Sequence, residues 1–108
     1  MRIIPLLALA LICASATRAD APAARDRHEV SIKNLQFKPA SIKIKAGQTV
    51  TWTNNDDRDH SVNFKEAKFQ SDNLKPGQTY EHTFAKPGKY PYVCGYHPRM
   101  KGEVVVVE

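Results

Sequence analysis

Residues 41–54 read SIKIKAGQTVTWTN. Apolar side chains alternate with polar ones around Ile44 and again around Trp52, which is the period of a strand that buries one face. Residues 45–48, between the two runs, include a glycine and are typical of a turn. The stretch therefore predicts two short strands joined by a tight connection.

The same alternation recurs along the rest of the chain, with turn residues between the runs. The further runs are Val30 and Ile32, Val62 and Phe64, residues 80–84, residues 90–94, and Val104 and Val106, and the turns are residues 54–57, 75–78 and 86–89. Seven or so short strands at this spacing predict an all-β fold, either an antiparallel sandwich of two sheets or a flattened barrel.

Two segments depart from the alternating pattern. Residues 65–74 are irregular, and we expect at most a turn of helix there. Residues 103–107 end in four consecutive valines. An apolar run without alternation favours a strand that is covered on both faces, or one that lies parallel to the first strand.

The first residues have the layout of a secretory signal. Arg2 precedes a short apolar run over residues 3–14, and small residues then offer cleavage points after Ala16 or Ala19. The apolar run is too short to span a bilayer comfortably. We therefore predict that residues 1–19 are a signal peptide and that the protein is exported without membrane insertion.

Lipid anchoring through Cys13 is the alternative to soluble export, but Ile12 before it is bulkier than the small residue that lipid-anchoring signals usually carry. Residues 20–27 have no periodicity, and we expect them to form a disordered leader. Residues 28–108 then form one domain, which has room for one core and one site.

The charge of the exported chain is only mildly basic. The full sequence carries a net charge of +5, and removing residues 1–19 takes away Arg2 and Arg18 and leaves +3. Three lysines lie among alternating apolar residues, where they solvate the outer faces of strands: Lys33, Lys43 and Lys45. This pattern argues against nucleic-acid binding, which uses clustered basic residues. We also expect the protein to be a monomer.

Cys94 is the only cysteine that remains after the signal is removed. A lone thiol in an oxidising compartment is prone to oxidation unless something protects it. The loop at residues 92–102 also contains His97 and Met100, and His60 follows a turn at the start of a strand. Two imidazoles, one thiolate and one thioether are the ligands of blue copper electron-transfer sites.

The spacing of residues across the chain strengthens this interpretation. The pattern is Phe37-x-Pro39-x-x-Ile42-x-Ile44-x-x-Gly47-x-x-Val50-x-Trp52-x-Asn54-x-Asp56, then His60, then Gly88-x-Tyr90-x-Tyr92-x-Cys94-x-x-His97. It resembles the plastocyanin and azurin group of cupredoxins over nearly the whole exported chain. The two-residue gap between His97 and Met100, and Pro98 after His97, are most similar to amicyanin.

The resemblance implies a cupredoxin-like Greek-key β-sandwich of seven or eight strands. It also implies one copper ion held by four ligands, namely His60, Cys94, His97 and Met100. His28 and His82 lie outside this set, and we interpret them as an ordinary surface or core histidine each. Zinc is a poor alternative, because Met is a weak zinc ligand and the usual paired Cys and His spacing is absent.

The function implied by the resemblance is single-electron transport in the periplasm by cycling between Cu(II) and Cu(I). We expect no enzyme activity, because Met100 fills the axial position and leaves no open site for a substrate. The expected partners are redox proteins, such as a dehydrogenase, a cytochrome c or a reductase, and His97 is the expected exit for the electron. Copper binding and delivery through the same ligands is the alternative function.

Two residues depart from the amicyanin pattern. Amicyanin and most of its relatives have Asn after the first histidine, where this chain has Ser61, so the reduction potential does not carry over. Arg99 stands where amicyanin has an aromatic residue in the apolar patch that meets its dehydrogenase. We therefore do not carry over the methylamine-oxidising partner, and we expect a different docking surface.

Overall fold

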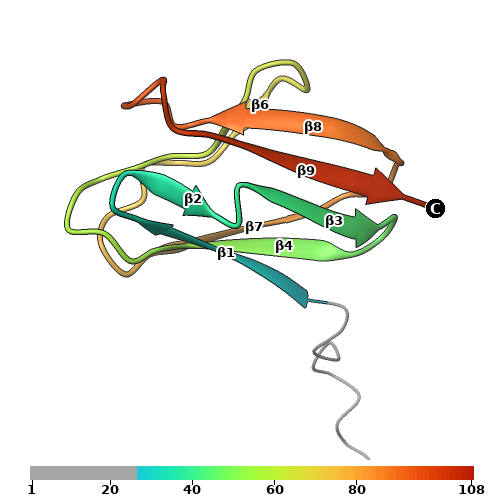
Figure 1. Cartoon of the computed structure of the whole chain (residues 1–108), viewed down its shortest axis with the longest axis horizontal. Coiled ribbons are helices and arrows are strands. Elements are labelled where there is room, and N and C mark those ends of the chain that lie inside the picture. Colours follow the sequence, from blue (N-terminus) through green and yellow to red (C-terminus); the bar gives the residue numbers. More distant parts are fainter. Residues whose placement is uncertain (1–26) are drawn as a thin grey trace, which may run out of the picture.

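The computed structural model describes residues 27–108, which form two sheets packed face to face (Figure 1). The nine strands in this part of the chain are β1 Arg27–Lys33, β2 Gln36–Lys38, β3 Ser41–Lys45, β4 Thr49–Asn54, β5 Asn63–Phe64, β6 Phe69–Gln70, β7 Thr79–Thr83, β8 Gly88–Val93 and β9 Lys101–Val107. The predicted all-β sandwich is confirmed, with nine strands rather than seven or eight, and the flattened barrel is excluded.

Both sheets are mixed, so the prediction of an antiparallel sandwich is wrong in one respect. One sheet has the order β2-β1-β4-β7 and the other has the order β3-β9-β8-β5-β6. The pairs β1–β4 and β3–β9 are parallel, and the remaining pairs are antiparallel. The chain crosses from the first sheet to the second between β2 and β3, so sequential strands there are not neighbours, and a local pattern cannot specify that crossing.

The last strand differs from its prediction in two ways. The parallel neighbour of β9 is β3, not the first strand. Its two faces also differ, since Val104 and Val106 are buried while Val105 is only partly buried and Val107 is exposed. Branched valines favour a strand conformation even on an outer face, so the unbroken apolar run did not signal burial on both sides.

Residues 65–68 form a turn rather than helix, and β6 follows it. The predicted turn at residues 75–78 is present, since Gly77 has a φ of +88° and Gln78 N–H donates to the Lys75 carbonyl at 2.9 Å. β1 begins at Arg27, one residue before the predicted start of the domain at His28. The predicted signal peptide and residues 20–26 of the predicted leader lie outside the described residues.

The core lies between the sheets and is rich in aromatic side chains. Its buried members are Val30, Ile32, Phe37, Ile44, Val50, Trp52, Val62, Phe64, Leu74, Phe84, Tyr92, Cys94, Met100, Val104 and Val106. Trp52 meets Tyr92 and Phe64 edge to face, with ring centroids 5.5 and 5.7 Å apart. Cys94 and Met100 are therefore continuous with a closely packed interior.

The loop after β4 and the loop after β8 lie at the same end of the sandwich, opposite the C terminus (Figure 1). This arrangement brings residues about thirty-five positions apart in the sequence to one place. Between residues 27 and 108, we find no helix of the length and apolar character that a membrane span requires.

Candidate metal centre

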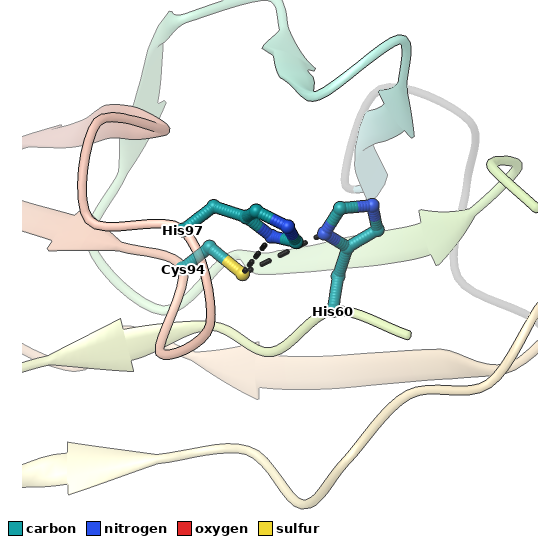
Figure 2. A group of neighbouring side chains, drawn as sticks. All are labelled: His60, Cys94 and His97. Carbon is teal, nitrogen blue, oxygen red and sulfur yellow. Dashed lines mark hydrogen bonds between the residues drawn. The ribbon is translucent and has the colours of Figure 1, made fainter. Parts of the chain in front are cut away.

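Three of the four predicted ligands converge at that end of the sandwich. The Cys94 sulfur lies 3.6 Å from His60 Nδ1 and 3.8 Å from His97 Nδ1. One ligand atom from each residue lies within 4.8 Å of the other two. Figure 2 shows His60 reaching the sulfur from the loop after β4, and His97 reaching it from the loop after β8. This is the only such cluster of metal-binding side chains in the described part of the chain.

His60 is fully buried and is held by its main chain and its ring. Its N–H donates to the Leu74 carbonyl at 3.0 Å, and its carbonyl accepts the Leu74 N–H at 2.8 Å. The ring places Nδ1 toward the sulfur and Nε2 toward the carboxylate of Asp56, 2.9 Å away. Both ring nitrogens therefore have defined neighbours, which fixes the orientation of the imidazole.

The loop that carries the other ligands is closed by its own hydrogen bonds. Cys94 N–H donates to the Met100 carbonyl at 3.0 Å, and Met100 N–H donates to the His97 carbonyl at 2.8 Å. Met100 is buried, and it lines the same surface pocket as the half-buried His97. The main chain thus folds Met100 back toward the cysteine from which the loop starts.

Ser61 joins the two ligand-bearing loops. Its N–H points to the Cys94 sulfur at 3.5 Å, and its hydroxyl accepts the Gly95 N–H at 2.9 Å. Ser61 is the residue that departs from the amicyanin pattern. Its short hydroxyl makes the connection between the loops directly.

The spacing of these atoms fits a bound metal ion. Ions such as zinc bind imidazole nitrogen at about 2.0–2.1 Å and thiolate sulfur at about 2.3 Å, so a trigonal arrangement would separate nitrogen from sulfur by about 3.8 Å. The observed separations are 3.6 and 3.8 Å. A thiolate and two imidazoles, with the thioether of Met100 in the same loop, favour copper over zinc or a hard cation.

Asp56 is part of the site, although the sequence alone gave it no role. Besides His60, its carboxylate accepts the N–H groups of Leu35 at 3.2 Å and Asp57 at 3.0 Å. The hydrogen bond from His60, with smaller contributions from the two backbone N–H groups, lowers the pKa of Asp56 from 3.8 to about 2, although burial opposes this shift. The carboxylate is thus ionised at neutral pH and can only accept, so His60 Nε2 carries the proton.

Asn54 shapes the turn that presents Asp56 and His60. Its side chain is buried, donates to the carbonyls of Arg58 and Leu74 at 2.7 and 2.8 Å, and accepts the Asp56 N–H at 2.9 Å. The sequence signals for Asp56 are its place in the pattern that resembles cupredoxins and its position four residues before a predicted ligand in a polar turn. Asn54 gave a clearer signal, since it continues the inward-facing alternation of β4.

The other two described histidines lie outside the cluster, as predicted. His28 Nε2 lies 3.0 Å from the Gln48 side-chain oxygen. The His82 ring stacks on Phe69 with centroids 4.1 Å apart, and burial lowers the pKa of His82.

A pocket of about 410 Å³ opens at the surface beside His97. It is lined by Leu35, Tyr96, His97, Pro98, Arg99 and Met100. The side chains of Leu35 and Tyr96 are 42% and 55% exposed, which makes them two of the three large apolar residues exposed in the described structure. The pocket therefore combines apolar walls with one cationic residue, next to a predicted ligand.

The chain matches the family model of the cupredoxin-like domain over residues 3–106, and it belongs to that family. Amicyanin-alpha of Methylorubrum extorquens is 40% identical over 104 residues, which cover 92% of this chain and 87% of the relative. Plastocyanin of Scenedesmus fuscus is 39% identical over 85 residues, covering 67% of this chain and 87% of the relative. A solved structure of a reduced amicyanin mutant has a TM-score of 0.72 at 34% identity, covering 78% of this chain and 85% of the other.

These matches confirm the predicted resemblance to cupredoxins and, among them, to amicyanin. Together with the cluster of His60, Cys94 and His97, they identify copper as the cofactor of this chain. They indicate a blue copper electron carrier.

Proposed function

We propose that this protein is an exported type 1 copper protein that carries single electrons between redox partners. The proposed ligands are His60, Cys94, His97 and Met100. The observation that supports this most strongly is the approach of the His60 and His97 Nδ1 atoms to one buried sulfur, at 3.6 and 3.8 Å. Bound copper supplies a one-electron couple between Cu(II) and Cu(I).

The residues around the site limit its movement when the charge changes. The Leu74 backbone and the Asp56 carboxylate hold His60, and hydrogen bonds across the loop hold Cys94 and Met100. Side chains positioned by strands and by their own hydrogen bonds keep their geometry better than side chains on free loops. A site that changes little between its two oxidation states suits rapid electron transfer rather than catalysis.

His97 is the proposed route for the electron, because it is the half-buried member of the cluster. Leu35 and Tyr96 give the surrounding surface an apolar centre, and Arg99 gives it a positive charge at the edge. A redox partner with an apolar contact area and nearby carboxylates would complement this surface. The positive charge of Arg99 would therefore favour this partner over one whose contact surface is purely apolar.

The site of action that we propose is the periplasm, on the basis of the signal-like sequence at residues 1–19. Mass spectrometry of the protein recovered from the periplasm of an expressing bacterium would test this, with a mature N terminus at Thr17 or Asp20 expected. An uncleaved Met1 in the exported protein would contradict it.

Copper(II) titration tests the proposed function. The purified protein should turn intensely blue with one equivalent of copper, bleach with ascorbate and recover its colour with an oxidant. The colour arises from charge transfer between thiolate and copper, so Cys94→Ser should abolish it. His28→Gln, which changes a histidine outside the cluster, is the matched control and should keep it.

Two outcomes would contradict this proposal. A pale spectrum that survives Cys94→Ser would indicate adventitious binding. Copper that leaves the protein on reduction and does not return the colour on reoxidation would favour copper delivery instead.

A further inference from the structure

The Asp56 carboxylate is fixed on three sides and faces a proposed ligand. Its Oδ2 lies 2.9 Å from His60 Nε2 and 3.2 Å from the Leu35 nitrogen, and its Oδ1 accepts the Asp57 N–H at 3.0 Å. Its side chain is only 12% exposed, and the His60 side chain is fully buried. A charged group in such surroundings interacts strongly with its neighbours, because little water screens it.

The Leu35 N–H reaches the carboxylate from a different hairpin. Residues Lys33 and Gln36 pair as the last rung between β1 and β2, and the two residues between them, Asn34 and Leu35, have φ angles of +54° and +59°. This left-handed conformation is uncommon for leucine. It turns the Leu35 N–H toward Asp56, so the β1–β2 hairpin helps to hold the carboxylate against His60.

We propose that Asp56 is a positioning residue for His60 that keeps the ring proton on Nε2, leaves Nδ1 free to face the Cys94 sulfur, and biases the copper couple toward the oxidised state. The choice of tautomer follows from the chemistry of imidazole, in which a hydrogen bond at one nitrogen selects the nitrogen that can bind metal. The effect on the copper couple follows from charge, because a carboxylate stabilises the more positive Cu(II) state. Only the effect on the couple rests on the proposed function.

The tautomer is tested without copper. In the metal-free protein, nitrogen NMR should find the His60 proton on Nε2 alone. Asp56→Ala removes the acceptor, and we expect a mixture of tautomers. Asp56→Asn retains a side-chain oxygen that can accept the hydrogen bond from Nε2–H, so the Nε2–H tautomer should persist. This variant covers the case in which Asp56→Ala does not fold. A pure Nε2–H tautomer in folded Asp56→Ala, or mainly Nδ1–H in the wild type, would overturn the positioning role.

The charge is tested by voltammetry of the copper-loaded protein. Asp56→Asn should favour Cu(I) about tenfold, which for one electron is a rise of about 59 mV. Asp57→Asn removes the same charge from the adjacent residue, whose side chain is 92% exposed, and should shift the potential much less. Equal shifts in the two variants, or no shift in Asp56→Asn, would overturn the effect of the Asp56 charge. A wild type that binds no copper would refute the proposed function, while the tautomer result would still stand.

Discussion

Ser61 shows how one small side chain connects two loops that are thirty-four residues apart. Its hydroxyl accepts the Gly95 N–H at 2.9 Å, while its own N–H points to the Cys94 sulfur. Ser61→Ala removes the first contact and keeps the second. Because Gly95 is exposed and water can replace the lost acceptor, we expect a loss of about 1 kcal/mol in the free energy of unfolding. Urea denaturation of the copper-free protein measures it.

The matched control for that change is Ser41→Ala, at an exposed position on β3. It should leave the stability within about 0.5 kcal/mol of the wild type. Equal destabilisation by the two substitutions would mean that the Ser61 hydroxyl has no special part in joining the loops.

The turn between β1 and β2 is strained at Leu35. A two-residue hairpin loop with positive φ at both positions strongly favours glycine in the second, yet this chain has a leucine there with φ of +59° and an exposed side chain. Leu35→Gly should relieve a strain of about 1–2 kcal/mol and lose about 0.4–1 kcal/mol to the greater freedom of the unfolded chain. We therefore expect a net gain in stability of between about 0 and 1.6 kcal/mol.

Thermal unfolding measures this gain, and Leu35→Ala is its control. Alanine removes the same exposed apolar surface but keeps the strained backbone, so it should not stabilise the protein. Both variants keep the backbone N–H of residue 35, which donates a hydrogen bond to the Asp56 carboxylate. A stability of Leu35→Gly at or below that of Leu35→Ala would show that the turn is not strained.

The sequence predicted strands better than it predicted their partners. Alternation located seven of the nine strands in the described chain, because apolar residues alternate within each of the seven or run on directly beside it, as Val62 does before β5. β2 and β6 are three and two residues long, too short for a period to be visible. The pairing of β9 with β3 depends on a crossover between sheets, and no local pattern encodes it.

The sequence likewise predicted some residues of the candidate site and missed another. Cys94, His97 and Met100 are close in sequence and formed a recognisable pattern. His60 was a candidate from its place after a turn at the start of a strand, and the resemblance to cupredoxins implied that it is a ligand. Asp56 was missed, because a polar residue in a turn is ordinary until the fold puts it against a ligand. Its partner Leu35 lies twenty-one residues upstream in another hairpin, which only the folded structure brings near.

The domain is stiffened by an aromatic core that reaches from one sheet to the other. Tyr92, two residues before Cys94, meets Trp52, Phe37 and Phe64 with ring centroids 4.7–5.5 Å apart. Its ring packs on the bare backbone of Gly102, where an added Cβ would lie 2.7 Å from Tyr92 Cε2. This packing ties the start of the ligand loop in β8 to its end in β9.

The same burial makes the stability of the domain sensitive to alkaline pH. Burial raises the pKa of Tyr92 from 10.0 to about 12, and the neighbouring Trp52 indole partly opposes the rise. A raised pKa means that the fold favours the neutral phenol. Its contribution is therefore complete below pH 10 and is lost as pH rises toward 12. One group contributes about 1.4 kcal/mol per pH unit over that window, so we expect a loss of roughly 2–3 kcal/mol from Tyr92 in urea denaturation of the copper-free protein.

Tyr92→Phe isolates this contribution. The hydroxyl and the Trp52 indole N–H beside it are both buried and have no hydrogen-bond partner of ordinary geometry within residues 27–108, so removing the hydroxyl breaks no such bond and should not destabilise the protein at pH 8. Above pH 10 the free energy of unfolding of the variant should fall less steeply with pH than that of the wild type. The difference in slope should correspond to one proton, or about 1.4 kcal/mol per pH unit. Burial also raises the pKa of Tyr80, so part of the alkaline loss should persist in the variant. Parallel curves for the two proteins between pH 10 and 12 would mean that Tyr92 ionises as readily in the folded domain as in the unfolded chain.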